Sequence, residues 1–395
     1  MPWRQCSLVE ARKAFVRAVH QKSDPVSVLC ARFGISRKTG YKWLARHERT
    51  GRRGLRDQSR RPHRPARLLA PRWHELARRL HRRRRTWGAR KLHAKLRQLH
   101  PRRRRPCVRT LQRWLAGWRP ARPRRQHARG GPKLPARPRA VARRPNDIWT
   151  LDFKGSFRTG TGQRVHPLTV RDLHSRYLLA VRSLPNQSDR NVRQVLGRVF
   201  ARYGLPKVIR VDNGAPFAGR GALGLSRLSV WWLRLGIQVE FTRRGHPEDN
   251  AGHEQMHGVY QRDNVRPPAW SLVAQQRREA RWREIFNHDR PHQALGGSVP
   301  ADHYTSSRRR LPRRLATPAY LAAWPTRKVD ARGAIYWQGR RRMLGRAFGG
   351  LPLGFKPLSA RRWEVYFQTH LVGLLHLHDR AGLRPAHRPA PKPKV

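Results

Sequence analysis

Apolar residues in the middle of the chain follow two spacings, one typical of strands and one typical of helices. Runs rich in β-branched and aromatic residues predict strands, and apolar residues three and four positions apart predict amphipathic helices. The predicted strands are residues 148–153, 165–170, 177–181, 208–211 and 237–241. The predicted helices are residues 192–203, 223–235, 249–263 and 275–286. Three consecutive strands are therefore followed by alternating helices and strands.

The N-terminal part of the chain is predicted to be helical. Residues 25–33 and 37–47 form two predicted helices around the turn Gly34-Ile35-Ser36, with Ser36 as the N-cap of the second. This pattern is typical of a helix-turn-helix, whose second helix enters the major groove of DNA. The residues expected inside are Val28, Leu29, Ile35, Trp43 and Leu44. The residues expected to face DNA are Arg37, Lys38, Thr39 and Lys42. An ordinary helical hairpin is the alternative.

A second helical unit follows a basic, proline-containing linker. Its apolar residues recur at helical spacing, at Trp73, Leu76, Ala77 and Leu80 and again at Leu92, Leu96 and Leu99. Residues 108–115 are predicted to be another recognition helix, with Arg109, Thr110 and Arg113 outward. Two such units in tandem predict a bipartite DNA-binding region.

The C-terminal part contains short apolar runs separated by glycine-rich turns. Residues 335–337, 341–344, 363–367 and 371–377 are strand candidates, and short strands of this kind favour a small β-barrel. The proline-rich end of the chain is expected to be disordered.

The charge of the chain identifies the class of partner. The 395 residues contain 89 Lys and Arg against 22 Asp and Glu, a net charge of +67. A charge of this size repels itself unless polyanions screen it, so nucleic acid is the expected partner. Cys6, Cys30 and Cys107 form no C-x-x-C pair, which argues against a zinc finger or a disulfide framework and fits a reducing compartment. No apolar run reaches about 18 residues, so no membrane association is expected.

Three carboxylates stand out because acidic residues are rare in this chain. Asp152 lies within the first predicted strand, Asp212 ends the fourth, and Glu254 lies within a helix. The order of the elements is that of a ribonuclease-H-like fold, in which the first and fourth strands are neighbours. Asp152 and Asp212 are therefore expected to converge. Clustered carboxylates are hard oxygen ligands that select Mg²⁺ or Mn²⁺, and two such ions can clamp the oxygens of a phosphoryl transfer.

Around these carboxylates the chain resembles the DDE transposases of bacterial insertion sequences, members of the retroviral-integrase superfamily. The segments that carry the resemblance are residues 149–155 (WTLDFKG), 172–177 (DLHSRY), 212–217 (DNGAPF), 225–232 (LSRLSVWW), 245–257 (GHPEDNAGHEQMH) and 286–295 (FNHDRPHQAL). The resemblance implies a catalytic triad of Asp152, Asp212 and Glu254 that also binds metal, with two Mg²⁺ or Mn²⁺ ions per site. It further implies hydrolysis at the element's ends, followed by attack of the freed 3′-hydroxyls on target DNA.

Glu248 competes with Glu254 for the third position of the triad. Between Asp212 and Glu248 lie 35 residues, the spacing usual in the superfamily, whereas 41 lie between Asp212 and Glu254. We favour Glu254 because it follows Asn250-Ala251 inside a helix, as the family's glutamate does. The segment with residues 225–232 accounts for the extra length.

The expected partners and location follow from charge and resemblance together. The partners are double-stranded DNA, both element ends and target, and further copies of the chain on that DNA. Further DNA-binding candidates are Lys154, Asn213, His257 and Arg262. The expected location is the bacterial cytoplasm, in association with the nucleoid.

Two other functions stay open at this stage. The first is a DNA-binding protein or repressor derived from a transposase that has lost activity, since Gln255 stands where relatives usually carry a basic residue. The second, more remote, is a zinc metalloprotease, because residues 253–257 (HEQMH) match H-E-x-x-H. In the transposase interpretation, His253 and His257 position DNA or support the carboxylates.

The expected architecture is multidomain, with α-helical N-terminal units, an α/β ribonuclease-H-like integrase core and a small C-terminal β-barrel. The predicted parts are a helix-turn-helix domain at 1–60, a second such unit at 66–120, a basic linker at 121–145, the integrase core at 146–305, the barrel at 325–380 and a tail at 381–395.

Overall fold

The computed structural model describes residues 7–58, 70–118, 140–219, 221–243, 251–379 and 382–384. The chain divides into two compact units, residues 1–69 and residues 70–395, and each is described by itself. Glu248, most of the predicted linker and most of the predicted tail lie outside the described residues.

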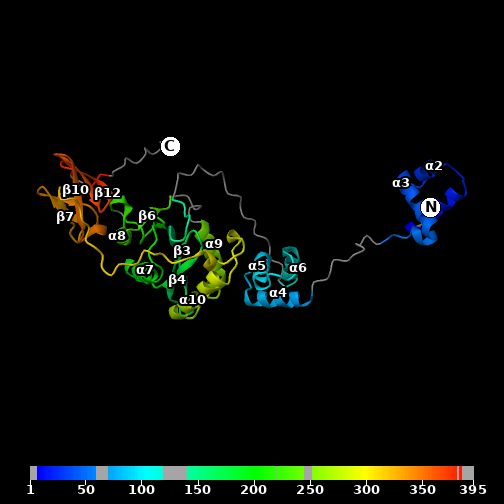
Figure 1. Cartoon of the computed structure of the whole chain (residues 1–395), viewed down its shortest axis with the longest axis horizontal. Helices are drawn as coiled ribbons and strands as arrows, with labels where there is room; N and C mark the ends of the chain where they lie inside the picture. Colours follow the sequence, from blue (N-terminus) through cyan, green and yellow to red (C-terminus); the bar gives the residue numbers. More distant parts are fainter. Residues whose placement is uncertain are drawn as a thin grey trace. The chain divides into compact units, whose positions relative to one another are not determined.

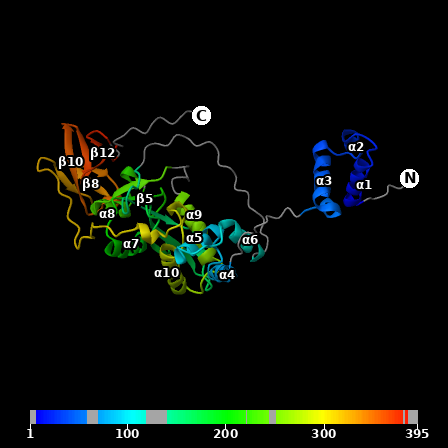
Figure 2. The ribbon, with the colours of Figure 1, turned by 45° about the vertical axis from the view of Figure 1, so that its right-hand side comes forward.

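The first unit is a bundle of three helices, α1 (Leu8–His20), α2 (Val26–Arg32) and α3 (Arg37–Thr50), closed by η1 (Gly51–Leu55) (Figure 2). The Ser36 side chain accepts a hydrogen bond from the Thr39 backbone N–H, which confirms the predicted N-cap of α3. The core consists of Phe15, Val16, Leu29, Cys30, Trp43 and Leu55. The helix-turn-helix prediction is therefore confirmed.

The packing of this bundle corrects one predicted core residue. Val28 is 51% exposed, because α2 has only seven residues and turns its next two positions, Leu29 and Cys30, to the core. Gly40 permits the close approach of α3, since a Cβ there would lie 2.5 Å from Cys30 Sγ.

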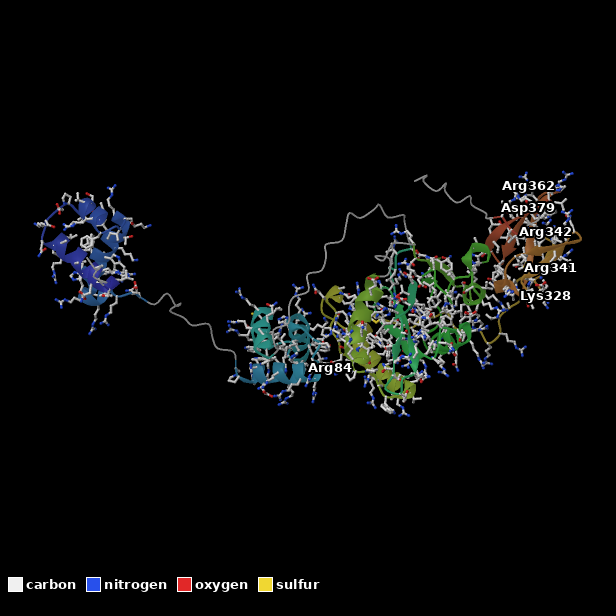
Figure 3. All side chains as sticks on the ribbon, turned by 180° about the vertical axis from the view of Figure 1, so that it is seen from behind. Arg84, Lys328, Arg341, Arg342, Arg362 and Asp379 are labelled. Atoms are coloured by element: carbon white, nitrogen blue, oxygen red, sulfur yellow. The ribbon has the colours of Figure 1, made fainter. Side chains whose placement is uncertain are left out.

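The second unit begins with three helices, α4 (Arg72–Arg83), α5 (Ala89–Leu99) and α6 (Val108–Trp118) (Figure 1). Trp73, Ala77, Leu92, Leu96, Leu111 and Leu115 are buried. Leu99 departs from the predicted apolar pattern and is 47% exposed, because it is the last residue of α5. Arg84, labelled in Figure 3, lies 2.9 Å from the Asp289 carboxylate, and Lys95 lies 2.7 Å from it. These ion pairs join the three helices to the following domain.

The central domain is built on a mixed sheet. Its strands are β1 (Ile148–Phe153), β2 (Phe157–Arg158), β3 (Arg164–Asp172), β4 (Leu178–Leu184), β5 (Val208–Val211) and β6 (Gln238–Phe241). The strand order is β2-β3-β1-β5-β6, and β4 pairs with β3. β1, β3 and β4 are antiparallel, whereas β5 and β6 run parallel to β1. This arrangement confirms the ribonuclease-H-like order and the predicted contact between the first and fourth long strands.

Helices pack against this sheet, at β4 and at β6. They are α7 (Asp189–Tyr203), α8 (Arg227–Arg234), α9 (Ala251–Tyr260), its continuation η4 (Gln261–Val265) and α10 (Leu272–His288). α9 and α10 share one apolar cluster with β4, which includes Leu178, Val181, Met256, Tyr260, Trp282 and Phe286. Short turns η2 (Ala222–Gly224), η5 (Gln293–Leu295) and η6 (Pro300–His303) complete the domain.

One predicted helix starts later than expected. Leu223 has a positive φ of 56°, so the segment from residue 223 does not continue as one α-helix. Instead, α8 begins after Ser226, whose side chain accepts a hydrogen bond from the Ser229 backbone N–H.

The C-terminal domain consists of antiparallel strands. They are β7 (Thr326–Lys328), β8 (Ala334–Trp337), β9 (Arg340–Met343), β10 (Pro352–Ser359), β11 (Arg362–Phe367) and β12 (His370–His376), with η7 (Arg346–Phe348) between β9 and β10. Within the described ranges they form a four-stranded sheet, β12-β11-β10-β7, and a β8-β9 hairpin, not one closed barrel. Of the predicted tail, Arg384 is described and forms a β-bridge with Leu374.

The C-terminal domain packs on the central domain through α8. Leu225, Val230 and Leu233 belong to the same apolar cluster as Phe348, Leu353 and other C-terminal residues. Figure 1 shows the orange and red strands beside α8. This shared core fixes the C-terminal domain against α8 of the central domain.

Candidate active site

Asp152 and Asp212 lie at the same level of two neighbouring parallel strands. β1 pairs with β5 in a register that matches Thr150 with Arg210. Asp152 lies two residues further along β1, and Asp212 is the first residue after β5. Neighbouring strands are about 4.8 Å apart. The sheet edge at the carboxyl ends of β1 and β5 therefore carries both carboxylates, Asp152 half-buried and Asp212 exposed.

α9 covers this part of the sheet and contacts Asp152 through His257. Nδ1 of His257 lies 3.8 Å from Oδ2 of Asp152, and its Nε2 lies 2.9 Å from Oγ1 of Thr169 on β3. The Thr169 hydroxyl donates to the Asp152 backbone carbonyl at 3.0 Å. Because that hydroxyl has a single proton, His257 Nε2–H is the donor to Thr169 Oγ1. The two hydrogen bonds of Thr169 therefore tie α9 to β3 and to the backbone of Asp152, and the His257 ring lies beside the Asp152 carboxylate.

Beneath the helix lies a buried basic layer. Arg171, opposite Thr150 in the β1–β3 register, is 3% exposed, and its guanidinium approaches Gly252 so closely that a Cβ there would lie 2.8 Å from an Nη atom. The rings of His253 and His257 stack 5.3 Å apart. Sequence reasoning missed Thr169 and Arg171. The charged Arg171 inside an apolar strand is the one signal that could have revealed the layer.

Burial in this layer keeps both histidines neutral. Burial, with the charges of Lys154 and Arg171, lowers the pKa of His257 to about 4. Burial, with His257 and Arg171, lowers the pKa of His253 well below its ordinary value. Burial also lowers the pKa of Arg171 to about 10, which leaves it charged at neutral pH. The base of the site thus holds one cation and two neutral rings.

Glu254 occupies the exposed side of the first turn of α9. It lies three residues before His257, and residues three apart are neighbours on a helix surface. The third candidate carboxylate is therefore one turn from the residue that contacts Asp152. Among the described residues, however, no group of three Asp, Glu, His or Cys side chains is gathered closely enough to hold a metal ion.

The far end of α9 is fixed by a buried carboxylate that the sequence did not reveal. Glu279 on α10 accepts hydrogen bonds from the Tyr260 hydroxyl, from Ser183 N at 2.7 Å and Oγ at 2.6 Å, and from Gln275 at 3.2 Å. α9 is thereby tied to both α10 and β4. These bonds, with the apolar cluster beneath, set the position of the helix that carries Glu254.

The predicted DNA-binding residues differ in accessibility. Arg37, Lys38 and Lys42 on α3, Arg109 and Arg113 on α6, and Arg262 are exposed, whereas Thr39 and Lys154 are half-buried. Asn213 is exposed, but its amide donates to the Thr242 carbonyl. His257 is corrected: it is 5% exposed and occupied by Thr169 and Asp152, so direct contact with DNA is not possible in this structure. Its hydrogen bond to Thr169, which donates to the Asp152 backbone carbonyl, agrees with the alternative role of supporting the carboxylates.

Comparison with protein families agrees with this domain structure. Residues 142–247 and 235–300 match models of the integrase core domain. Residues 11–63 match a helix-turn-helix domain, and residues 325–382 match the C-terminal domain of the IS481 family transposases.

Similar proteins come from bacterial insertion elements. The chain is 29% identical over 236 residues to the "Insertion element IS407 uncharacterized 31.7 kDa protein" of Burkholderia multivorans, which covers 60% of this chain and 80% of that protein. It is 30% identical over 159 residues to the "Insertion element IS476 uncharacterized 39.2 kDa protein" of Xanthomonas euvesicatoria, covering 40% and 44% respectively.

Solved structures with some similarity are viral integrases. The HTLV-2 integrase catalytic core domain in complex with magnesium is 13% identical with a TM-score of 0.34, covering 42% of this chain and 100% of that one. A chain of the simian T-cell lymphotropic virus intasome in complex with PP2A regulatory subunit B56 gamma is 17% identical with a TM-score of 0.35, covering 76% of this chain and 98% of that one.

The fold and the matched domains define an integrase-core protein, the class of the polynucleotidyl transferases. Within that class, its C-terminal domain is similar to that of the IS481 family transposases, and the relatives named above come from insertion elements. These similarities support a role in transposition and DNA integration. Among the helices of the described ranges, none has the length and apolar character needed to cross a membrane.

Proposed function

We propose that this protein cleaves DNA at the ends of an insertion sequence and joins those ends to target DNA, with Asp152, Asp212 and Glu254 as its catalytic residues. The observation that carries the proposal is the β1–β5 register, with Asp152 and Asp212 each two residues beyond the Thr150–Arg210 pair. α9, which carries Glu254, contacts the same aspartate through His257.

The donor set fits a divalent cation. All three candidates are carboxylates, the ligands that Mg²⁺ and Mn²⁺ prefer, and Asp212 and Glu254 are exposed where a phosphodiester could approach. Asp152, Asp212 and Glu254 would hold the metal, two ions per site. When bound, such ions activate the attacking oxygen and stabilise the leaving oxygen of a phosphoryl transfer.

The chain's other residues orient these carboxylates and bind DNA. The Thr169 hydroxyl, bonded to His257, fixes the backbone of Asp152, and the charged Arg171 lies beneath them. The exposed residues Arg37, Lys38 and Lys42 of α3 supply contacts to bases and phosphates of the element end. Because two ends must be cut and joined, the working form is an oligomer on DNA in the bacterial cytoplasm, associated with the nucleoid.

The zinc metalloprotease alternative is not supported by the contacts of His257. Its Nε2 is hydrogen-bonded to Thr169 and its Nδ1 faces Asp152, so neither nitrogen is directed to a shared site with His253 on the helix surface. A DNA-binding relic would have the same fold, and only an assay separates it from an active enzyme.

The experiment is a cleavage and strand-transfer assay on DNA from the regions that flank the gene. The wild type should produce nicked ends and joined products with Mg²⁺ or Mn²⁺, lose both after chelation, and recover them when the metal is restored. Asp152→Asn and Asp212→Asn should bind the same DNA without cutting it. Binding without any cleavage by the wild type would indicate a relic, and activity restored by Zn²⁺ alone would contradict the proposal.

A further inference from the structure

A basic cavity lies where α7 and α8 meet the C-terminal domain. It has a volume of about 610 Å³. One wall comes from α7 and α8, with Arg193, Arg227 and Arg234, and the opposite wall comes from β7 and the η7 region, with Lys328 and Arg346. Lys328, labelled in Figure 3, lies on the C-terminal sheet. The shared apolar cluster of Val230, Leu233 and Phe348 fixes the two walls against each other.

The cations that line this cavity outnumber its carboxylates. Five cationic side chains line it against one carboxylate, Asp330. That carboxylate already accepts from the Ala334 backbone N–H at 2.8 Å and lies 3.4 Å from Arg341. Arg234 donates to the carbonyls of Leu315 and Ala316, and Asp189 attracts Arg227 from outside the cavity. Within the described part of the chain, no ion pair neutralises Arg193, Lys328 or Arg346.

The remaining lining suits a ligand that carries both charge and an apolar part. Trp231, Val230 and Leu351 line the cavity, and the Arg193 guanidinium lies 4.9 Å from the Trp231 ring centre. Cations from two facing walls above such a floor match the alternating phosphates and sugars of a nucleic-acid backbone. Arg227, Arg193, Lys328 and Arg346 are exposed, so a continuous strand can reach them.

We propose that this cavity, the α8 seam, binds the sugar–phosphate backbone of duplex DNA outside the segment held at the catalytic edge. The inference rests on the proposed function, because it assigns a second DNA contact to the same protein. The seam reads no bases: its guanidinium and ammonium groups hold phosphates and fix the position of the duplex. One duplex bound across the seam would bridge the integrase core and the C-terminal domain.

The test measures binding of a duplex that lacks element-end sequence to full-length Asp152→Asn protein, which lacks one of the proposed catalytic carboxylates. The seam variant is Arg227→Glu with Arg346→Glu. The control is Arg198→Glu with Arg281→Glu, two exposed arginines outside the seam that change the net charge equally. At ~0.15 M salt, the seam variant should have a Kd about 10-fold or more higher than that of the control variant. The slope of log affinity against log salt should also be smaller in the seam variant, by about 2.

Two further measurements keep the result interpretable. The neutral double variant Arg227→Gln with Arg346→Gln should lose DNA affinity to a smaller extent. Its thermal unfolding should be unchanged, which would show that the loss of affinity is not caused by misfolding. Potassium phosphate and potassium chloride of matched ionic strength should displace the duplex equally.

Equal losses in seam and control variants would overturn the proposal, because net charge alone would then explain the binding. Selective displacement of the duplex by phosphate would also overturn the proposal if it disappeared in the seam variant, because the seam would then bind a small anion. The same result with an acidic peptide would indicate that the seam binds a protein. Because no chemistry is measured, the result is independent of whether the wild type cleaves DNA.

Discussion

His257 is linked to Asp152 through Thr169, whose hydroxyl accepts from Nε2 of His257 at 2.9 Å and donates to the Asp152 backbone carbonyl at 3.0 Å. The histidine is 5% exposed and reaches the aspartate from α9, 105 positions later in the chain, while its Nε2 is bonded to Thr169. The candidate catalytic edge is therefore formed by a strand that carries Asp152 and by a helix that is hydrogen-bonded to that strand through Thr169 and carries Glu254.

Removing this restraint should weaken cleavage without abolishing it. His257→Ala should reduce the cleavage rate roughly 10- to 100-fold, the usual cost of losing a group that orients a ligand, and should leave DNA binding within a few-fold. Single-turnover cleavage and filter binding measure the two effects. Gln255→Ala, an exposed position on the same helix, is the control. If DNA affinity fell as much as the cleavage rate, the result would instead support the first hypothesis, in which His257 contacts DNA directly.

Glu279 should be important for stability because it is a buried carboxylate with several donors. Glu279→Ala leaves Ser183, Tyr260 and Gln275 without their acceptor and should lower the free energy of unfolding by about 3 kcal/mol. Glu284→Ala, on the exposed side of α10, should cost at most about 1 kcal/mol. Denaturant unfolding measures both. Equal effects would show that the network does not hold α9.

His292 should make the protein sensitive to acid. Burial, with the charges of Arg290, Arg171, Lys91 and Arg176, lowers the pKa of His292 to about 3. Since the unfolded residue titrates near 6.5, the unfolded state binds more protons between these values, and stability falls as pH drops from about 6.5 toward 3. His292→Phe should reduce the slope by about 1.4 kcal/mol per pH unit. Unfolding would be measured from pH 7 to 5, and an unchanged slope in the variant would show that burial does not lower the pKa of His292.

The exposed basic residues of α3 should provide sequence-specific binding. Arg37→Ala and Lys42→Ala should each weaken binding to the element end, and a residue that reads bases should also reduce the preference for that end over scrambled DNA. A residue that contacts only phosphate should lower the salt slope by about 0.9. Arg49→Ala, exposed at the other end of α3, is the control. Unchanged preference in both variants would reject α3 as the recognition helix.

Some elements of the fold could be predicted from the sequence and others could not, for physical reasons. β1, β5 and α9 were predictable because their apolar periodicity is strong and because the resemblance marks Asp152, Asp212 and Glu254. β7 and β10 were missed, since β7 is exposed along its length and β10 contains two prolines and a glycine. Partners brought together only by the fold, such as Arg171 beneath Gly252 or Glu279 against Tyr260, have no local pattern that predicts them.

The most direct test of the account is cleavage of authentic element ends by Glu254→Gln and Glu248→Gln, each compared with the wild type at equal DNA binding. Glu254→Gln keeps the size of the side chain but removes the charge that a catalytic metal requires, so it should abolish cleavage and leave affinity nearly unchanged. Glu248→Gln should retain most activity. Full activity of Glu254→Gln together with an inactive Glu248→Gln would contradict the account, because it would place the third carboxylate outside α9.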